Sequence, residues 1–195
     1  MRHQLIELSP QALFLSRRRA LSTSGAAVLS ASAVALLGGR DALAAGANGK
    51  DLESDVRILN TALGAELEAI AAYQVGAESG LLSKGVLPLA VQFQGHHKEH
   101  AAALAATVQK LGGKPVSAKD KYQFPVEKLK AEADVLRFAA GLERGAISAY
   151  LGAVPVFADR ALAQVAASIL GDEAMHWAVL RNALGEQPVP SAFMS

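Results

Sequence analysis

Two stretches of the chain repeat the same pattern of side chains that bind metal ions, and this repeat is the strongest chemical signal in the sequence. Glu66 is followed seven residues later by Tyr73, and Glu143 is followed seven residues later by Tyr150. A glycine-led segment with a histidine at the same place comes after each pair, as GHHKEH at residues 95–100 and GDEAMH at residues 171–176. Carboxylates and imidazoles in this order are typical of a site that holds two metal ions between helices.

Six side chains are the candidate metal ligands, because each falls on the apolar stripe of its helix at steps of three and four residues. They are Glu66, His97, His100, Glu143, Glu173 and His176. A buried carboxylate without a partner costs on the order of several kcal/mol, so three of them in one layer need cations. Two divalent ions bring four positive charges, which balance three carboxylates and one hydroxide when the histidines are neutral. The sequence therefore predicts a buried two-metal site.

Neighbouring residues are open to more than one interpretation. Tyr73 and Tyr150 lie on the same stripes, where they either pack in the core or hydrogen-bond to a carboxylate ligand one layer away. His96 and Glu99 fall off the stripe of their helix, so we expect both at the surface. A single Glu-x-x-His or one histidine would mean little, and the prediction depends on the duplication over four stripes.

Four segments with helical periodicity must position these residues. They run from about residue 51 to 78, from 87 to 112, from 126 to 154 and from 159 to 184. The first and last links are short, whereas the middle link of residues 112–125 can extend to about 45 Å, longer than the roughly 39 Å of a helix of about 26 residues. The predicted fold is all-α, a four-helix bundle with one long crossover between the second and third helices.

The first 45 residues are expected to be a signal peptide of the twin-arginine type. Arg17 and Arg18 precede an apolar run at residues 25–37, and residues 42–44 (ALA) form a small-x-small cleavage site. The apolar run is too short for a permanent membrane anchor, although an amphipathic or membrane helix is the alternative interpretation. We expect export by the twin-arginine machinery to the periplasm or beyond, with no stable membrane anchor after cleavage.

The remaining chain is predicted to hold the bundle at residues 46–187 and a loosely attached tail at residues 188–195. From residue 46 onward there are 14 Lys and Arg against 16 Asp and Glu, a net charge of −2. Without a basic stripe, nucleic acid is not an expected partner. The chain has no cysteine, which excludes disulfides, iron–sulfur clusters and a four-cysteine iron site. The expected partners are small oxidants or metal ions, and a homodimer is compatible with the sequence.

With this ligand order the sequence resembles the ferritin-like superfamily of di-iron and di-manganese carboxylate proteins, which includes rubrerythrins, bacterioferritins and manganese catalases. An exported chain of this size without cysteine is similar in particular to the stress- and desiccation-related ferritin-like proteins. The superfamily pattern is one Glu from each of two helices and Glu-x-x-His from each of the other two. Glu66, Glu143, Glu173 and His176 match this pattern, but His97 stands where the second motif has Glu, and only His100 matches there.

The resemblance implies an exported protein with two divalent ions, iron or manganese, that carries out redox chemistry on dioxygen or hydrogen peroxide in oxidative or desiccation stress. Three imidazoles make the site softer and more open to manganese, zinc or mixed occupancy. The alternative is a non-catalytic metal-binding or stress-protective structural protein with a modified site. A subunit of an iron-storage cage is disfavoured, because the sequence shows no fifth helix and has the altered ligand.

Overall fold

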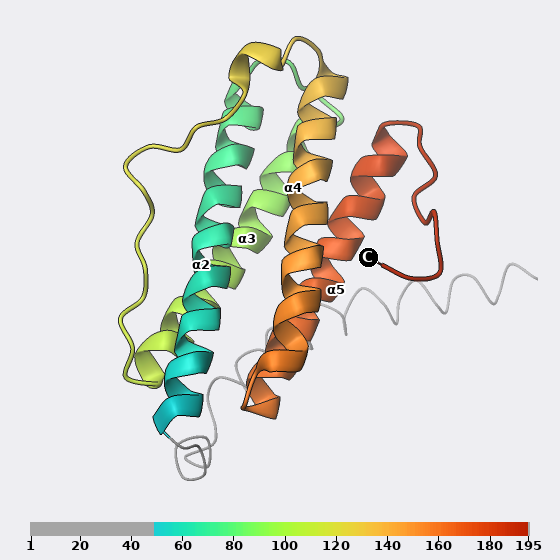
Figure 1. Ribbon diagram of the computed structural model, residues 1–195. Helices are drawn as coiled ribbons and strands as arrows, with labels where there is room; N and C mark the ends of the chain where they lie inside the picture. Colours follow the sequence, from blue (N-terminus) through green and yellow to red (C-terminus); the bar gives the residue numbers. More distant parts are fainter. Residues whose placement is uncertain (1–48, 195) are drawn as a thin grey trace, which may run out of the picture. The chain divides into compact units, whose positions relative to one another are not determined.

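Four long helices account for most of residues 49–194, the part of the chain that the computed structural model describes. They are α2 (Gly49–Glu78), α3 (Leu87–Lys110), α4 (Glu132–Ala153) and α5 (Arg160–Ala183), with short 3-10 turns η1 (Val126–Lys128) and η2 (Val154–Val156) (Figure 1). No strand occurs between residues 49 and 194, so the predicted all-α fold is confirmed. The expected signal peptide lies outside the described residues.

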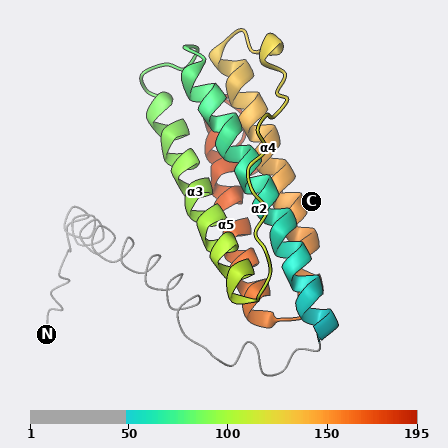
Figure 2. The ribbon, with the colours of Figure 1, turned by 90° about the vertical axis from the view of Figure 1, so that its left-hand side faces the viewer.

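The helices pair as two antiparallel hairpins, α2 with α3 and α4 with α5, and α2 also packs against α4. Residues 111–131 connect the hairpins and run along the bundle beside α2, from the end of α3 to the start of α4 (Figures 1 and 2). The predicted long crossover is therefore confirmed. None of the helices in residues 49–194 is long and apolar enough to span a membrane.

The crossover is fixed where it leaves α3. Gly112 takes a positive φ of 78°, which a residue with a side chain rarely adopts and which turns the chain away from the helix. The Asn60 side chain on α2 then holds the crossover from both sides: its amide nitrogen donates to the Lys114 carbonyl at 3.1 Å, and its oxygen accepts from the Val116 N–H at 2.8 Å. These bonds satisfy backbone groups that the crossover cannot satisfy by itself.

Helix α4 begins at Glu132, six residues later than predicted. The chain forms η1 first and is then extended at Leu129 and Ala131, so the helix cannot start directly after Pro125. The Asp134 carboxylate accepts hydrogen bonds from the N–H groups of Lys130 and Ala131, at 3.1 and 3.0 Å. This side chain therefore fixes the true start of α4.

A carboxylate of α2 fixes the turn that precedes helix α5. Asp55 is 2% exposed, and its two oxygens accept from the N–H groups of Ala158 and Asp159, at 2.9 and 3.0 Å. Asp159 in turn caps the helix by accepting from the Ala161 N–H at 2.6 Å. The buried Asp55 thus joins the first helix to the turn that begins the last one.

The apolar core is divided into two clusters along the bundle. One lies where α2 and α5 begin and includes Leu59, Leu63, Leu104, Val108, Leu162 and Ile169. The other lies toward the start of α4 and includes Phe93, Leu136, Ile147, Trp177 and Leu180, with Met194 of the tail packed against it. Along α2, α3 and α5 the candidate ligands fall between the two clusters, and on α4 Glu143 falls between Ala140 and Ile147 of the second cluster. Apolar side chains therefore cover the ligands toward both ends of the bundle.

Candidate metal centre

All six predicted ligands come together in the middle of the bundle, and all four helices contribute. Glu66 comes from α2, His97 and His100 from α3, Glu143 from α4, and Glu173 and His176 from α5. Five of the residues are at most 2% exposed, and the His100 side chain is 14% exposed. The antiparallel packing of the hairpins places these positions at the same level along the bundle axis, as the repeated sequence spacing predicts.

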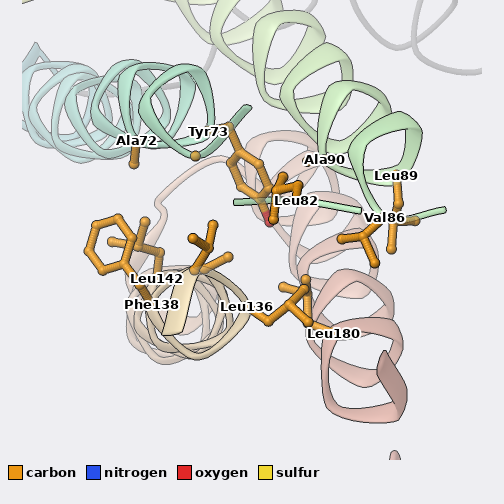
Figure 3. Close-up of a pocket in the computed structure, with 13 residues that line it drawn as sticks. Ala72, Tyr73, Leu82, Val86, Leu89, Ala90, Leu136, Phe138, Leu142 and Leu180 are labelled. Carbon is orange, nitrogen blue, oxygen red and sulfur yellow. The ribbon is translucent and has the colours of Figure 1, made fainter. Parts of the chain in front are cut away.

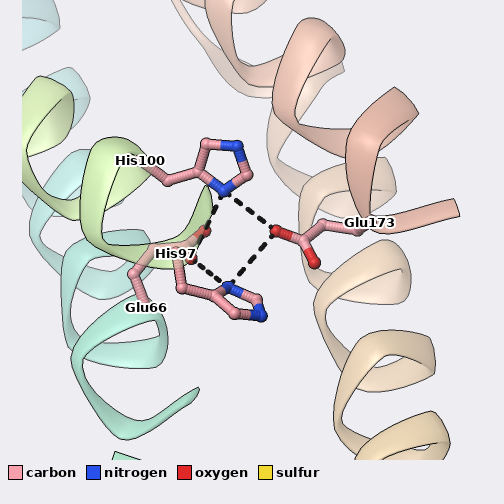
Figure 4. Close-up of side chains that lie close together, drawn as sticks. All are labelled: Glu66, His97, His100 and Glu173. Atoms are coloured by element: carbon pink, nitrogen blue, oxygen red, sulfur yellow. Dashed lines mark hydrogen bonds and ion pairs between the residues drawn. The ribbon is translucent and has the colours of Figure 1, made fainter. Parts of the chain in front are cut away.

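A first ligand group consists of Glu66, His97, His100 and Glu173, whose donor atoms all lie within 4.8 Å of one another (Figure 4). His97 Nδ1 is 2.8 Å from Glu66 Oε2 and 3.6 Å from Glu173 Oε1. His100 Nδ1 is 3.1 Å from the same Glu173 oxygen and 3.6 Å from Glu66 Oε2. Two carboxylates and two imidazoles therefore face one small volume.

A second ligand group consists of His97, Glu143, Glu173 and His176, again with donor atoms within 4.8 Å. His97 Nε2 is 3.4 Å from Glu143 Oε1, and His176 Nδ1 is 3.5 Å from both Glu143 Oε1 and Glu173 Oε2. His97 and Glu173 belong to both groups. His97 directs Nδ1 to one group and Nε2 to the other, at the position where the superfamily pattern has a glutamate.

Several polar atoms at this centre lack a hydrogen-bond partner among the described residues. They are His100 Nδ1, Glu143 Oε2, both oxygens of Glu173 and His176 Nδ1. A buried polar atom without a partner costs about 1–3 kcal/mol, so native proteins rarely leave several together. All these atoms belong to the two ligand groups, and each group offers four oxygen and nitrogen donors, the set that iron, manganese and zinc accept. The residues present therefore fit a pair of divalent ions.

The two tyrosines hold the two single carboxylates in a reciprocal arrangement. The Tyr150 hydroxyl on α4 donates to Glu66 Oε1 on α2 at 2.6 Å, and the Tyr73 hydroxyl on α2 donates to Glu143 Oε1 on α4. Burial raises the pKa of both phenols, and the carboxylate that each one faces raises it further. Each tyrosine therefore stays protonated and fixes the carboxylate of the opposite helix.

The three carboxylates differ in their affinity for protons. Burial alone would raise the pKa of Glu66, but contacts with His100 and His97 outweigh it and lower the pKa to about 2. Burial opposes ionisation of Glu143 as well, and His176 and His97 hold its pKa below the ordinary range. Burial and the neighbouring Glu143 instead raise the pKa of Glu173. Without metal, protons at the centre therefore concentrate on Glu173 and the histidines.

The histidines bind protons strongly when no metal is present. Burial would lower their pKa values, yet the surrounding carboxylates outweigh it, raising the pKa of His97 to about 9 and those of His100 and His176 to about 11. A metal ion must displace these protons, because only the neutral imidazole offers a lone pair.

Asp172 contacts two of the candidate ligands, although the sequence did not predict it as part of the centre. Its Oδ2 lies 3.4 Å from His100 Nε2 and 3.2 Å from His176 Nε2, the outward nitrogens of two candidate ligands. These contacts outweigh its burial and hold the pKa of the Asp172 carboxyl well below the usual range. A carboxylate that accepts from Nε2–H leaves the Nδ1 lone pair facing inward, as a metal ligand requires.

The expectation that His96 lies at the surface is only partly met, because its ring also contacts the centre. Its side chain is 34% exposed, and its Nδ1 lies 2.8 Å from His176 Nε2 and 3.2 Å from Asp172 Oδ2. The helical step of 100° places His96 beside the stripe, but α5 packs closely enough to reach it. Glu99 is exposed, as expected.

An apolar cavity of about 20 Å³ lies on the α4-start side of the centre (Figure 3). Side chains from all four helices and from the 79–86 turn line it, among them Tyr73, Leu82, Val86, Leu136 and Leu180. Tyr73 lies between this cavity and Glu143, because its ring contributes to the lining and its hydroxyl bonds the carboxylate. On another side Phe93 stacks on His176 with ring centroids 4.0 Å apart. Apolar side chains thus cover the polar centre on these two sides.

The family profile of the ferritin-like domain matches residues 54–186, which contain all six candidate ligands. The chain belongs to this ferritin-like domain family. Solved structures show the same fold at low sequence identity. A conserved hypothetical protein from Mycobacterium tuberculosis has a TM-score of 0.64 and 23% identity over 73% of this chain and 99% of that chain.

Two further structural relatives of this ferritin-like domain are described as di-iron proteins. The bacterioferritin of Desulfovibrio desulfuricans has a TM-score of 0.65 and 22% identity, over 72% of this chain and 84% of that chain. A ferritin-like, di-iron-carboxylate protein of Bacillus anthracis has a TM-score of 0.60 and 20% identity, over 70% and 99%. A search of curated protein sequences finds no significant match.

Proposed function

We propose that this ferritin-like domain is an exported dimetal protein that holds two divalent ions, iron or manganese, and uses them in redox chemistry on dioxygen or hydrogen peroxide. The observation that carries the proposal is the meeting of buried donor atoms from four helices, among which five atoms of His100, Glu143, Glu173 and His176 have no hydrogen-bond partner in residues 49–194. An oxidative or desiccation stress role follows from the resemblance described above.

In this proposal the side chains act by position and charge. Glu66, His100 and His97 Nδ1 would hold one ion, and Glu143 and His176 would hold the other, while Glu173 faces both positions. A pair of iron or manganese ions would supply one-electron redox chemistry at this centre. Tyr73 and Tyr150 keep the two single carboxylates in place, and the apolar walls exclude water, which strengthens the electrostatic interactions inside.

The apolar cavity beside Tyr73 supports dioxygen as the oxidant. A cavity lined by hydrocarbon side chains is unfavourable for water and for polar hydrogen peroxide, whereas a small apolar gas is accepted there. Its volume of about 20 Å³ exceeds the roughly 10–15 Å³ that one molecule the size of water needs.

Elemental analysis of protein purified after native export, combined with dioxygen and peroxide turnover on the same sample, tests the proposal. We expect two equivalents of iron or manganese and turnover of at least one oxidant. The matched variant is Glu143→Gln, which keeps the shape of the side chain but removes a charged ligand, and it should lose metal and turnover together. Full metal content with no turnover of either oxidant would reject the redox function.

A non-catalytic metal-binding or stress-protective role is the second candidate, and His97 is the observation that favours it. Three imidazoles with three carboxylates suit zinc, which has no redox chemistry, better than four carboxylates with two imidazoles do. Zinc in the exported protein, with a large loss of thermal stability on chelation, would support this function instead.

Export by the twin-arginine route is a separate part of the proposal, since it rests on residues 1–45 alone. Changing Arg17 and Arg18 together to Lys should leave the precursor in the cytoplasm, measured by cell fractionation and immunoblotting. The single change Arg40→Lys, outside the motif, serves as the control. Continued export of the double variant would assign the leader to the general secretory route.

A further inference from the structure

A third group of metal-binding side chains lies just outside the proposed dimetal centre. It consists of His96, Asp172 and His176, whose donor atoms all lie within 4.8 Å of one another. His96 Nδ1 is 2.8 Å from His176 Nε2, and Asp172 Oδ2 is 3.2 Å from each of these nitrogens. We call these three residues the outer group.

The outer group extends from the solvent to the buried centre. The side chains of His96 and Asp172 are 34% and 23% exposed, whereas the His176 side chain is 2% exposed. An ion on the first two residues would therefore keep water in its remaining positions. Two imidazoles and one carboxylate form a ligand set that first-row divalent ions accept with open positions.

His176 belongs to both the outer group and the second ligand group, through different atoms. Its Nδ1 faces Glu143 and Glu173 at 3.5 Å, and its Nε2 faces the outer group. A neutral imidazole has one lone pair, and its other nitrogen carries a proton. His176 can therefore bind an ion on its inner side or on its outer side, but not on both.

We propose that the outer group is a separate, weaker divalent-cation site from which ions are passed to the dimetal centre by His176. With an ion outside, His176 binds it through Nε2 and carries its proton on Nδ1. When the ion moves inward to Nδ1, that proton leaves and one proton is taken up on Nε2, where Asp172 accepts a hydrogen bond from it. The proton count of His176 is unchanged by the transfer.

Partial exposure makes this site weaker than the buried groups, because water competes with His96 and Asp172 for the ion. Weak binding suits a loading site, since an ion that is held too tightly outside would not move inward. The inference rests on the proposed dimetal function, because loading has meaning only if the inner groups bind metal.

Titration of the metal-free protein with Co²⁺ tests the outer site, with bound ions counted by equilibrium dialysis and inner loading followed by stopped-flow absorbance. The wild type should bind two ions tightly and a third more weakly, because His176 then serves the inner pair and the third ion keeps only His96 and Asp172. His96→Gln should keep the two tight ions, weaken the third by at least about tenfold and slow inner loading by a similar factor. Glu99→Gln, an exposed change on the same helix, should behave as the wild type.

Two results would overturn the outer site. The first is that His96→Gln binds the third ion as tightly as the wild type and loads the inner groups as fast. The second is that the wild type binds no ion whose affinity changes in His96→Gln. Failure of the dimetal function gives a different result, in which neither the wild type nor either variant binds two Co²⁺ ions tightly. An ion that is then still lost in His96→Gln would support the outer site alone. Anomalous diffraction from Co²⁺-soaked crystals should place the third ion beside His96 Nδ1.

Discussion

His97 is the residue at which this centre departs most from the superfamily pattern. A glutamate has two oxygens that can serve two ions at once, one for each ligand group. A neutral imidazole has a single lone pair, although the two nitrogens of His97 face the two groups. His97 would therefore serve one ion at a time, and Glu173 would be the one of the six candidate ligands that can serve both ions at once.

Changing His97 to Glu should shift metal preference toward iron, because the change adds a hard oxygen ligand and one negative charge. It should lower the reduction potential of the metal pair and raise the rate of ferrous oxidation by dioxygen. Metal content after growth in mixed metals and the rate of ferric absorbance measure both effects. Equal metal content and equal rates in both proteins would show that position 97 does not touch the metals.

Tyr150→Phe should lower the free energy of unfolding of the metal-free protein by about 1–3 kcal/mol, because Glu66 Oε1 loses a buried donor. Urea denaturation with constant m-value measures the change. Tyr122→Phe is the matched control: the Tyr122 hydroxyl only accepts from the Lys119 N–H, in an exposed part of the crossover. A loss no larger than that of the control would mean that solvent replaces the tyrosine at Glu66.

At the residue scale, the repeated spacing was sufficient to predict which six side chains meet, because helical periodicity places them on inward stripes of known height. Their role as metal ligands stays a prediction. Asp172 and His96 were not predicted as part of the centre, since each lies one helical step away from a stripe. Their contacts depend on how closely α3 and α5 pack, which periodicity within one helix does not report.

At the scale of the elements, the start of the crossover packs tightly against α2 at Gly113. A Cβ atom on Gly113 would lie 2.6 Å from Val56 Cγ1 on α2, and 3.2 Å from the Val108 carbonyl oxygen. The crossover therefore has no space for a side chain at this position, because the Val56 side chain of α2 fills it.

Gly113→Ala should destabilise the protein by about 1–3 kcal/mol through this overlap. Thermal or urea unfolding measures the loss. Gly145→Ala, on the exposed side of α4 with nothing within 4 Å of a Cβ, should instead stabilise by about 0.5–1 kcal/mol. The double variant with Val56→Ala should show a favourable coupling energy, and strict additivity would mean that the crossover moves away from α2.

The four helices, the order of the hairpins and the long crossover followed from periodicity and breakers, and the comparison structures share this fold. The start of α4 was placed six residues too early, because Pro125 permits a helix and nothing local shows that the chain is extended at Leu129 and Ala131. The anchor of α5 on Asp55 was also missed, since its partners lie more than a hundred residues away in the sequence.

For the whole molecule, the charges at the centre predict how stability depends on pH in the metal-free state. The pKa values of His97, His100 and His176 are raised from 6.5 to about 9 and 11, so their stabilising effect is complete below pH 6.5 and is lost as pH rises through 9 to 11. The pKa of Glu66 is lowered from 4.5 to about 2, so its contribution is present above pH 4.5 and is lost as pH falls toward 2.

The metal-free protein should therefore be most stable between about pH 4.5 and 6.5, measured by urea unfolding across pH. Metal binding should reverse the loss of stability at alkaline pH, because the ion replaces the protons of the histidines and binds more tightly as pH rises. Calorimetry in buffers of different ionisation enthalpy should detect proton release on binding. Metal binding without proton release at pH 7 would show that the histidines are already neutral.

The division of the ligands between the hairpins has a consequence for the folding pathway. The α2–α3 hairpin carries Glu66, His97 and His100, and the α4–α5 hairpin carries Glu143, Glu173 and His176. Each ligand group takes members from both hairpins, so neither hairpin holds a complete group before the two have docked. In the proposed dimetal protein, tight metal binding would therefore require that both hairpins have docked in the correct register, so a bound ion would distinguish fully assembled molecules from half-folded ones.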